Sequence, residues 1–175
     1  MSDDASLPDP VERELDAHDA FEPADGGYEL TTTVFDALVD AKPAEGRRDG
    51  EFVVVIELPS LDAAVADRPV PAVVEDDWAE TLERRLQDVF DVARTDTHEA
   101  PAVTREPSVI RVTLEYAAWN AAEGVEDAKA LIEYVEGTYA QGLIPGYEYR
   151  GPAATLLENA QSRGRGAAEG GDAPP

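Results

Sequence analysis

The sequence predicts an α+β fold, a two-layer sandwich in which an antiparallel sheet of about four strands carries amphipathic helices on one face. Two segments predict strands: residues 109–117 alternate apolar and polar residues with a period of two, and residues 52–58 form a short apolar run rich in β-branched residues. Two others, residues 75–93 and 125–139, repeat apolar residues every three or four positions, as helices do. With a shorter helix and weaker strands before them, the predicted order is α-ββ-α-ββ-α.

The first element is a short amphipathic helix. Asp9 is the expected N-cap and Pro10 the first helical residue. The apolar face of this helix has four members: Val11, Leu15, His18 and Phe21. Residues 22–27, which contain Pro23 and two glycines, are expected to end it.

Residues 28–41 predict strand structure whose apolar parity changes near Val34–Phe35, which indicates a bulge or a break. The next strand, residues 52–58, has Phe52, Val54, Ile56 and Leu58 on its inward row. Val53 and Val55 have the opposite parity, so we expect the other face of this central strand to be largely covered as well. Pro59 ends the strand, and Pro69 and Pro71 predict an irregular connection.

The second half begins with the strongest helical pattern. Three acids, Glu75 to Asp77, favour a helix start because the macrodipole stabilises anions there. Its apolar stripe comprises Trp78, Leu82, Leu86, Val89, Phe90 and Ala93. A weak strand is predicted over 101–105 and a strong one over 109–117, whose inward row is Ile110, Val112, Leu114 and Tyr116. The last long helix covers 125–139 and ends before Gly142 and Pro145.

The domain organisation is a single domain over residues 9–161. Residues 1–8 are expected to be a disordered N-terminus. Residues 162–175 are expected to be a disordered tail, because the stretch from Gly164 to Pro175 consists largely of Gly, Ala and Pro and offers little to bury.

Charge is the most unusual property of the chain. Asp and Glu number 38 against 14 Lys and Arg, a net charge of -24, and the acids occur in every segment. This pattern is typical of a halophilic surface, whose self-repulsion is screened at molar salt, where the Debye length is about 3 Å. An acidic chain also starts with repulsion from phosphates, so we expect no nucleic-acid partner.

Location and covalent chemistry follow from what the sequence lacks. The acidic start, Met1 to Asp4, does not resemble a signal peptide, and no apolar run approaches the roughly 20 residues of a membrane span. The absence of cysteine excludes disulfides and thiolate catalysis. We therefore expect a cytoplasmic protein without a membrane partner.

Three segments carry a resemblance to a known family: Asp77-Trp78-Ala79-Glu80-Thr81-Leu82-Glu83-Arg84-Arg85-Leu86, residues 134–139, and Gly142-Leu143-Ile144-Pro145-Gly146-Tyr147-Glu148-Tyr149. They resemble a family of small haloarchaeal proteins known as domain of unknown function 5813, over roughly residues 10 to 160. The resemblance implies a halophilic archaeal cytoplasm and brings no known activity, cofactor or catalytic residue.

Few residues are candidates for chemistry. His18 and His98 lie in separate segments without metal-ligand spacing, so no metal and no cofactor are predicted. Glu57 and Glu115 are the only acids embedded in strongly apolar strands. If these strands are neighbours, the two carboxylates could form an acid/base pair of a small enzyme. The alternative is that both are ordinary solvated residues.

The last candidate is an aromatic and apolar set around the end of the final helix: Trp119, Tyr139, Leu143, Ile144, Tyr147 and Tyr149. Tyrosine and tryptophan are favoured at binding surfaces, so this set is a candidate interface. The other interpretation is that residues 139–152 cap the sheet of their own chain. We therefore predict a noncatalytic binding or assembly module that forms a homodimer or binds another protein, with the small enzyme as the alternative.

Salt dependence tests the charge argument. We expect the melting temperature to rise between about 0.1 M and about 2 M KCl, because salt screens carboxylate repulsion and strengthens apolar burial. Calorimetric melting across this range checks the expectation, and a melting temperature that stays flat or falls would contradict it.

Overall fold

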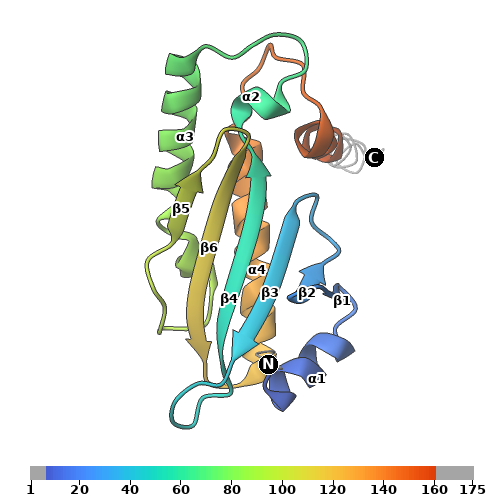
Figure 1. The fold of residues 1–175 in the computed structure, drawn as a ribbon, viewed down its shortest axis with the longest axis vertical. Helices are drawn as coiled ribbons and strands as arrows, with labels where there is room; N and C mark the ends of the chain where they lie inside the picture. The colour runs from blue at the N-terminus through green and yellow to red at the C-terminus, as the bar shows by residue number, and fades with distance from the viewer. Residues whose placement is uncertain (1–6, 161–175) are drawn as a thin grey trace, which may run out of the picture.

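In the computed structural model, which describes residues 7–160, one antiparallel sheet of six strands has the order β1-β2-β3-β4-β6-β5 (Figure 1). The strands are β1 (Phe21–Ala24), β2 (Gly27–Leu30), β3 (Asp36–Lys42), β4 (Gly50–Pro59), β5 (Ala102–Arg105) and β6 (Val109–Ala118). The helices are α1 (Asp9–Ala17), α2 (Leu61–Ala64), α3 (Ala72–Leu86), the 3₁₀ helix η1 (Val89–Val92) and α4 (Ala121–Gln141). Residues 151–160 are also helical.

The α+β class is confirmed, whereas the predicted four strands and the order α-ββ-α-ββ-α are wrong. Four strands precede the second helix, because β1 and β2 form a hairpin ahead of β3. The predicted disordered ends, 1–8 and 162–175, lie almost entirely outside the described residues. Leu7 belongs to the predicted N-terminal segment and is described, and its side chain packs partly against the core.

The centre of the sheet is the pair β4 and β6, which align over ten residues from Gly50 opposite Ala118 to Pro59 opposite Val109. Burial alternates along both strands, and the inward rows are the predicted ones. The buried row comprises Phe52, Val54, Ile56, Leu58, Ile110, Val112, Leu114, Tyr116 and Ala118. All of these side chains point to the same side, where the core lies.

Helix α4 covers this buried side. It contacts β4 and β6, and α1, α3 and η1 contact α4 in turn, so these helices share its side of the sheet. In Figure 1, α4 lies behind the sheet. Trp78 of α3 packs edge-to-face on Tyr139 of α4, with ring centroids 5.5 Å apart, and its indole N–H donates to the Gly142 carbonyl at 3.1 Å. The predicted apolar stripe is therefore correctly phased from Trp78 to Leu86, but the predicted helix is too long, because α3 ends at Leu86 and a separate 3₁₀ helix, η1, carries Val89 and Phe90.

Strand β1, and with it the β1–β2 hairpin, was missed at the sequence level, whereas β2 lies in the predicted strand segment 28–41. Phe21, predicted on the face of the first helix, begins β1 instead. Pro23 and Gly26–Gly27 are typical helix breakers, but here Pro23 lies in an edge strand and Gly26, with a φ of +86°, forms the turn. The predicted break near Val34–Phe35 is confirmed, because β2 ends at Leu30 and β3 begins at Asp36.

Two helix starts also differ from the expectation. Helix α3 begins at Ala72, directly after Pro71 and three residues before Glu75. Glu75 instead accepts hydrogen bonds from the backbone N–H groups of Leu61 and Asp62, and so caps the short helix α2. Helix α2 was not predicted, because the prolines of this connection indicated irregular structure. Helix α1 begins at Asp9, with Pro8 in the cap position.

Close packing of α4 on the sheet depends on Gly124. A Cβ placed on Gly124 would lie 2.4 Å from Phe52 Cε1 and 2.8 Å from the Ala118 Cβ. We predict that Gly124→Ala lowers the free energy of unfolding by about 1–3 kcal/mol, because overpacking outweighs the better helix propensity of alanine. Denaturant unfolding measures the change.

Gly137 is the matched control within the same helix. A Cβ there would meet nothing within 4 Å, so Gly137→Ala should raise the free energy of unfolding by about 0.5–1 kcal/mol. A Gly124→Ala protein as stable as Gly137→Ala would show that α4 does not approach the sheet this closely.

Candidate functional site

The side of the sheet opposite α4, here called the open face, has no helix over it within residues 7–160. Figure 1 looks onto it. Val53 and Val55 of β4 are partly exposed and lie outside the core, as does Leu38 of β3. The prediction that this second face of β4 is covered is therefore wrong. The valines that suggested it lie on a sheet surface that is open to solvent.

The register arranges the open face in rows across the strands. Leu38 lies opposite Val55, which lies opposite Thr113, so the middle row carries no charge. By their register, seven acids project from the open face: Glu22, Glu29, Asp36, Asp40, Glu51, Glu57 and Glu115. Among the paired strand residues, the register places only two cations on the open face, Lys42 and Arg111. The face is therefore acidic with an apolar centre.

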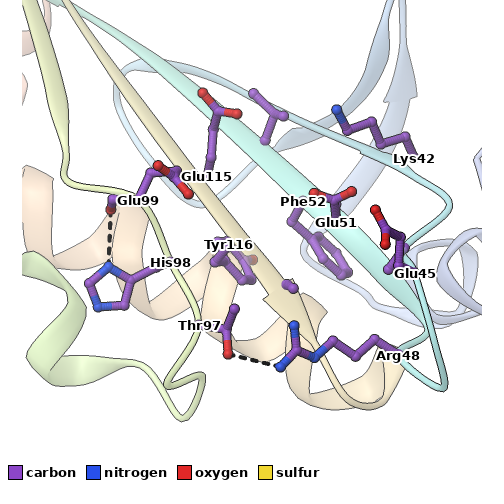
Figure 2. A pocket seen from close by; sticks show the side chains of 13 residues that line it. Lys42, Glu45, Arg48, Glu51, Phe52, Thr97, His98, Glu99, Glu115 and Tyr116 are labelled. Atoms are coloured by element: carbon purple, nitrogen blue, oxygen red, sulfur yellow. Dashed lines mark hydrogen bonds between the residues drawn. The ribbon is translucent and has the colours of Figure 1, made fainter.

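A hollow of about 460 Å³ lies at one end of the open face, where β4 begins and β6 ends (Figure 2). Its charged lining consists of four glutamates, Glu45, Glu51, Glu99 and Glu115, and two cations, Lys42 and Arg48. Because the acids outnumber the cations, the hollow favours positively charged ligand groups over anions.

One wall of the hollow is the segment that precedes β5, and α4 fixes it. Asp127, only 3% exposed, accepts hydrogen bonds from the backbone N–H groups of Arg94 at 2.8 Å and Thr95 at 3.0 Å. The Thr95 hydroxyl donates to the Ala117 carbonyl at 2.7 Å. The His98 ring stacks on Phe90 with centroids 3.9 Å apart. These contacts attach the wall to α4, β6 and η1.

Behind the hollow, on the core side of the sheet, two of the residues that line it carry buried aromatic rings. Phe52 and Tyr116 stack with ring centroids 5.1 Å apart, and the Tyr116 hydroxyl donates to the Gly124 carbonyl at 2.7 Å. Burial, with a smaller contribution from the charge of Asp127, raises the pKa of Tyr116 well above its usual value. Tyr116 is therefore protonated at neutral pH and does not serve as a base.

The other rim is formed by Arg48 from the connection between β3 and β4. Its guanidinium donates to the Thr97 hydroxyl at 3.1 Å, as Figure 2 shows, and lies 4.8 Å from the centre of the Trp119 ring. Trp119 is 58% exposed beside the hollow. It is the one member of the predicted aromatic surface that the structure brings to this site.

The predicted acid/base pair is not brought together. Glu57 and Glu115 both project from the open face, but Glu57 lies opposite Arg111, whereas Glu115 lies opposite Val53. In β4, Val53 comes four residues before Glu57. Four residues of strand span about 13 Å. The Arg111 guanidinium donates to Glu57 at 2.7 Å and also pairs with Glu106. The contact with Glu57, followed by the charge of Glu106, raises the pKa of Arg111.

The rest of the predicted aromatic surface packs within the chain, as the cap interpretation expects. Tyr139 is 0% exposed and its hydroxyl donates to the Pro59 carbonyl at 3.0 Å. Leu143, Ile144, Tyr147 and Tyr149 are partly buried against the core. The Tyr149 hydroxyl bridges the N–H and carbonyl of Ile144, and Tyr149 also pairs with Val65. These five residues therefore do not form a contiguous exposed patch.

Metal ligands and membrane spans are the remaining questions. His18 contacts Glu126 of α4, and His98 lines the hollow. Within residues 7–160, no three His, Asp or Glu side chains converge so as to hold a metal ion. None of the helices in the described part of the chain has the length and apolarity needed to cross a membrane.

The loop residues of the hollow were missed at the sequence level. Glu45, Arg48, Thr97 and Glu99 come from two connections that lie far apart in the chain, and no local motif marks them. The only sequence signal for the lining of the hollow was strand parity, which places Glu51 and Glu115 on the same side of the sheet as Val53. Which loops flank them depends on the register of β4 with β6.

Asp127 gives a test of the fixed wall. Asp127→Ala should lower the free energy of unfolding by about 2–4 kcal/mol, because two part-buried backbone N–H groups lose their charged acceptor. It should also speed amide hydrogen exchange at Arg94 and Thr95. Glu133→Ala is the control, since its exposed i,i+4 pair with Lys129 is worth only about 0.3–0.5 kcal/mol. Equal effects of the two substitutions would contradict the role of Asp127.

A comparison with known protein families identifies a family for this chain. A model described as "Family of unknown function (DUF5813)" matches residues 16–159, which include all six strands and the hollow. Neither a curated protein nor a solved structure matches the chain.

Proposed function

The chain belongs to this family of unknown function, and from its geometry we propose that it is a noncatalytic binding module that docks a partner protein on its open face. The observation that carries the proposal is the uncovered row Leu38, Val55 and Thr113 in the middle of the sheet. Contiguous exposed apolar surface is a mark of interaction sites in soluble proteins.

Energetics support docking at this face. Fully burying an aliphatic side chain is worth about 1.5–3 kcal/mol, and the partly exposed Leu38, Val53 and Val55 retain a share of this for a partner. Trp119, at the edge of the face, is of the residue type most enriched among binding hot spots. The fixed wall of the hollow supports affinity because a preorganised surface loses little entropy on binding.

The geometry favours a binding module over the small enzyme. Glu57 forms an ion pair with Arg111, and the strand positions of Glu57 and Glu115 are separated by about 13 Å. The phenol of Tyr116 donates its proton to a backbone carbonyl. A pair of groups poised to exchange a proton with a substrate would need to lie within hydrogen-bond reach of a common ligand.

We also propose that the protein works at molar salt in the cytoplasm of a halophile. The net charge of -24 supports this setting, because such a surface repels itself in dilute buffer. Tests of binding therefore belong at high salt, where short-range contacts persist and long-range attraction is suppressed.

Retention of partners on immobilised protein in about 2 M KCl tests the proposal. Three proteins are compared: the wild type, Val55→Asp on the open face, and Val73→Asp on α3, where the valine is 75% exposed. We expect the same partner to stay on the wild type and on Val73→Asp and to be lost from Val55→Asp.

Equal retention on all three proteins would contradict docking at the open face. Melting of each variant shows whether the fold is intact, and Glu115→Arg is a second open-face variant in case Val55→Asp unfolds. Sedimentation of the same proteins identifies self-association: a wild-type dimer that Val55→Asp dissociates would make the partner a second copy.

A further inference from the structure

We infer that the partner presents to the open face an extended segment in which apolar side chains alternate with lysine or arginine. This inference rests on the proposed function and adds the chemistry of the partner. It follows from how charge and apolar surface are ordered on the face, from which acids have partners within the chain, and from the shape of the hollow.

Apolar and acidic positions alternate along β3 on the open face, from Asp36 through Leu38 to Asp40. The uncharged row through Val55 lies between two rows that carry two acids each, Asp36 and Glu57 beside Arg111 in one, and Asp40 and Glu115 on either side of Val53 in the other. Residues two apart in a strand are separated by about 7 Å on the same face. An extended segment repeats its side chains at the same interval, so apolar and cationic residues in alternation match these rows.

Most acids of this face have no cation of their own. Among the described residues, Glu57 is the single open-face acid that takes part in an ion pair, with Arg111. Asp36, Asp40, Glu51 and Glu115 have no ion-pair partner within residues 7–160. A cationic partner would gain charge-assisted contacts there without breaking any that the chain already makes.

The hollow fits the end of such a segment. At about 460 Å³ it can take a long side chain, and its lining combines the apolar Val53 and Ala117 with carboxylates. Lysine and arginine bury their aliphatic stems against apolar surface while the charged head stays with polar groups. Glu51, Glu99 and Glu115 are placed to receive that head.

Charge also argues against a second copy as the occupant. Two open faces in contact would bring seven acids of one against seven of the other, with only Lys42 and Arg111 on each side to offset them. Like charges in direct contact disfavour association even where salt screens longer distances. A basic segment is complementary to the same surface.

The test measures the affinity of the protein for three synthetic nine-residue peptide probes by titration calorimetry, in about 0.2 M and about 2 M KCl. The first is Lys-Thr-Val-Thr-Lys-Thr-Val-Thr-Lys, which places Lys and Val on one face of an extended chain. The second has Glu in place of Lys, and the third has Thr in place of Val. We expect the first probe to bind at least about tenfold more tightly than either of the others.

Two protein variants of equal charge change locate the binding. Glu51→Gln with Glu115→Gln should weaken the first probe at least about tenfold. Glu80→Gln with Glu83→Gln, on exposed positions of α3, should leave its affinity unchanged. Equal losses in both double variants would mean general attraction to an acidic protein and would overturn the inference.

The remaining outcomes are equally decisive. Equal affinity for the lysine and glutamate probes, equal affinity for the valine and threonine probes, or no binding of any probe would each overturn the inference. The proposed function would still stand if Val55→Asp releases the partner while the Glu51 and Glu115 substitutions do not. Both would fail if Val55→Asp has no effect on partner retention.

Discussion

The ten-residue pairing of β4 with β6 is the constraint on which the rest of the structure depends. Because side chains alternate along paired strands, this register puts Phe52 and Tyr116 on one side and Val53 and Glu115 on the other. Helix α4 covers the first side at the close approach of Gly124. The second side is left as the open face, and the hollow forms where the two strands meet the connections at their ends.

The two sides of the sheet therefore have separate tasks. The buried side supplies the core, to which the helices and the cap of residues 142–150 add their apolar side chains. The open face contributes little to that core, so its acids and its apolar row are available for contact with another molecule. Asp127 links the sides, because a carboxylate on the covering helix fixes the wall of the hollow.

Sequence reasoning was accurate where one pattern extends over many residues. The inward rows of β4 and β6, the stripe of α3 and the body of α4 follow from periodicity alone. It failed at two short elements beside turn residues: β1 and α2 have four residues each, with Pro23, Gly26 and Pro59 among or beside them. The misjudged face of β4 has another cause, because Val53 and Val55 look the same in a sequence whether a second layer covers them or solvent does.

Thiol labelling tests most directly whether the open face is exposed. The chain has no cysteine, so a single introduced thiol is reported without background. Val55→Cys in the full-length protein should react within about tenfold of the rate of a free peptide thiol, whereas Val54→Cys, whose valine is fully buried, should react at least about 100-fold more slowly. A Val55→Cys thiol as protected as Val54→Cys would mean that the face is covered, and would contradict the account.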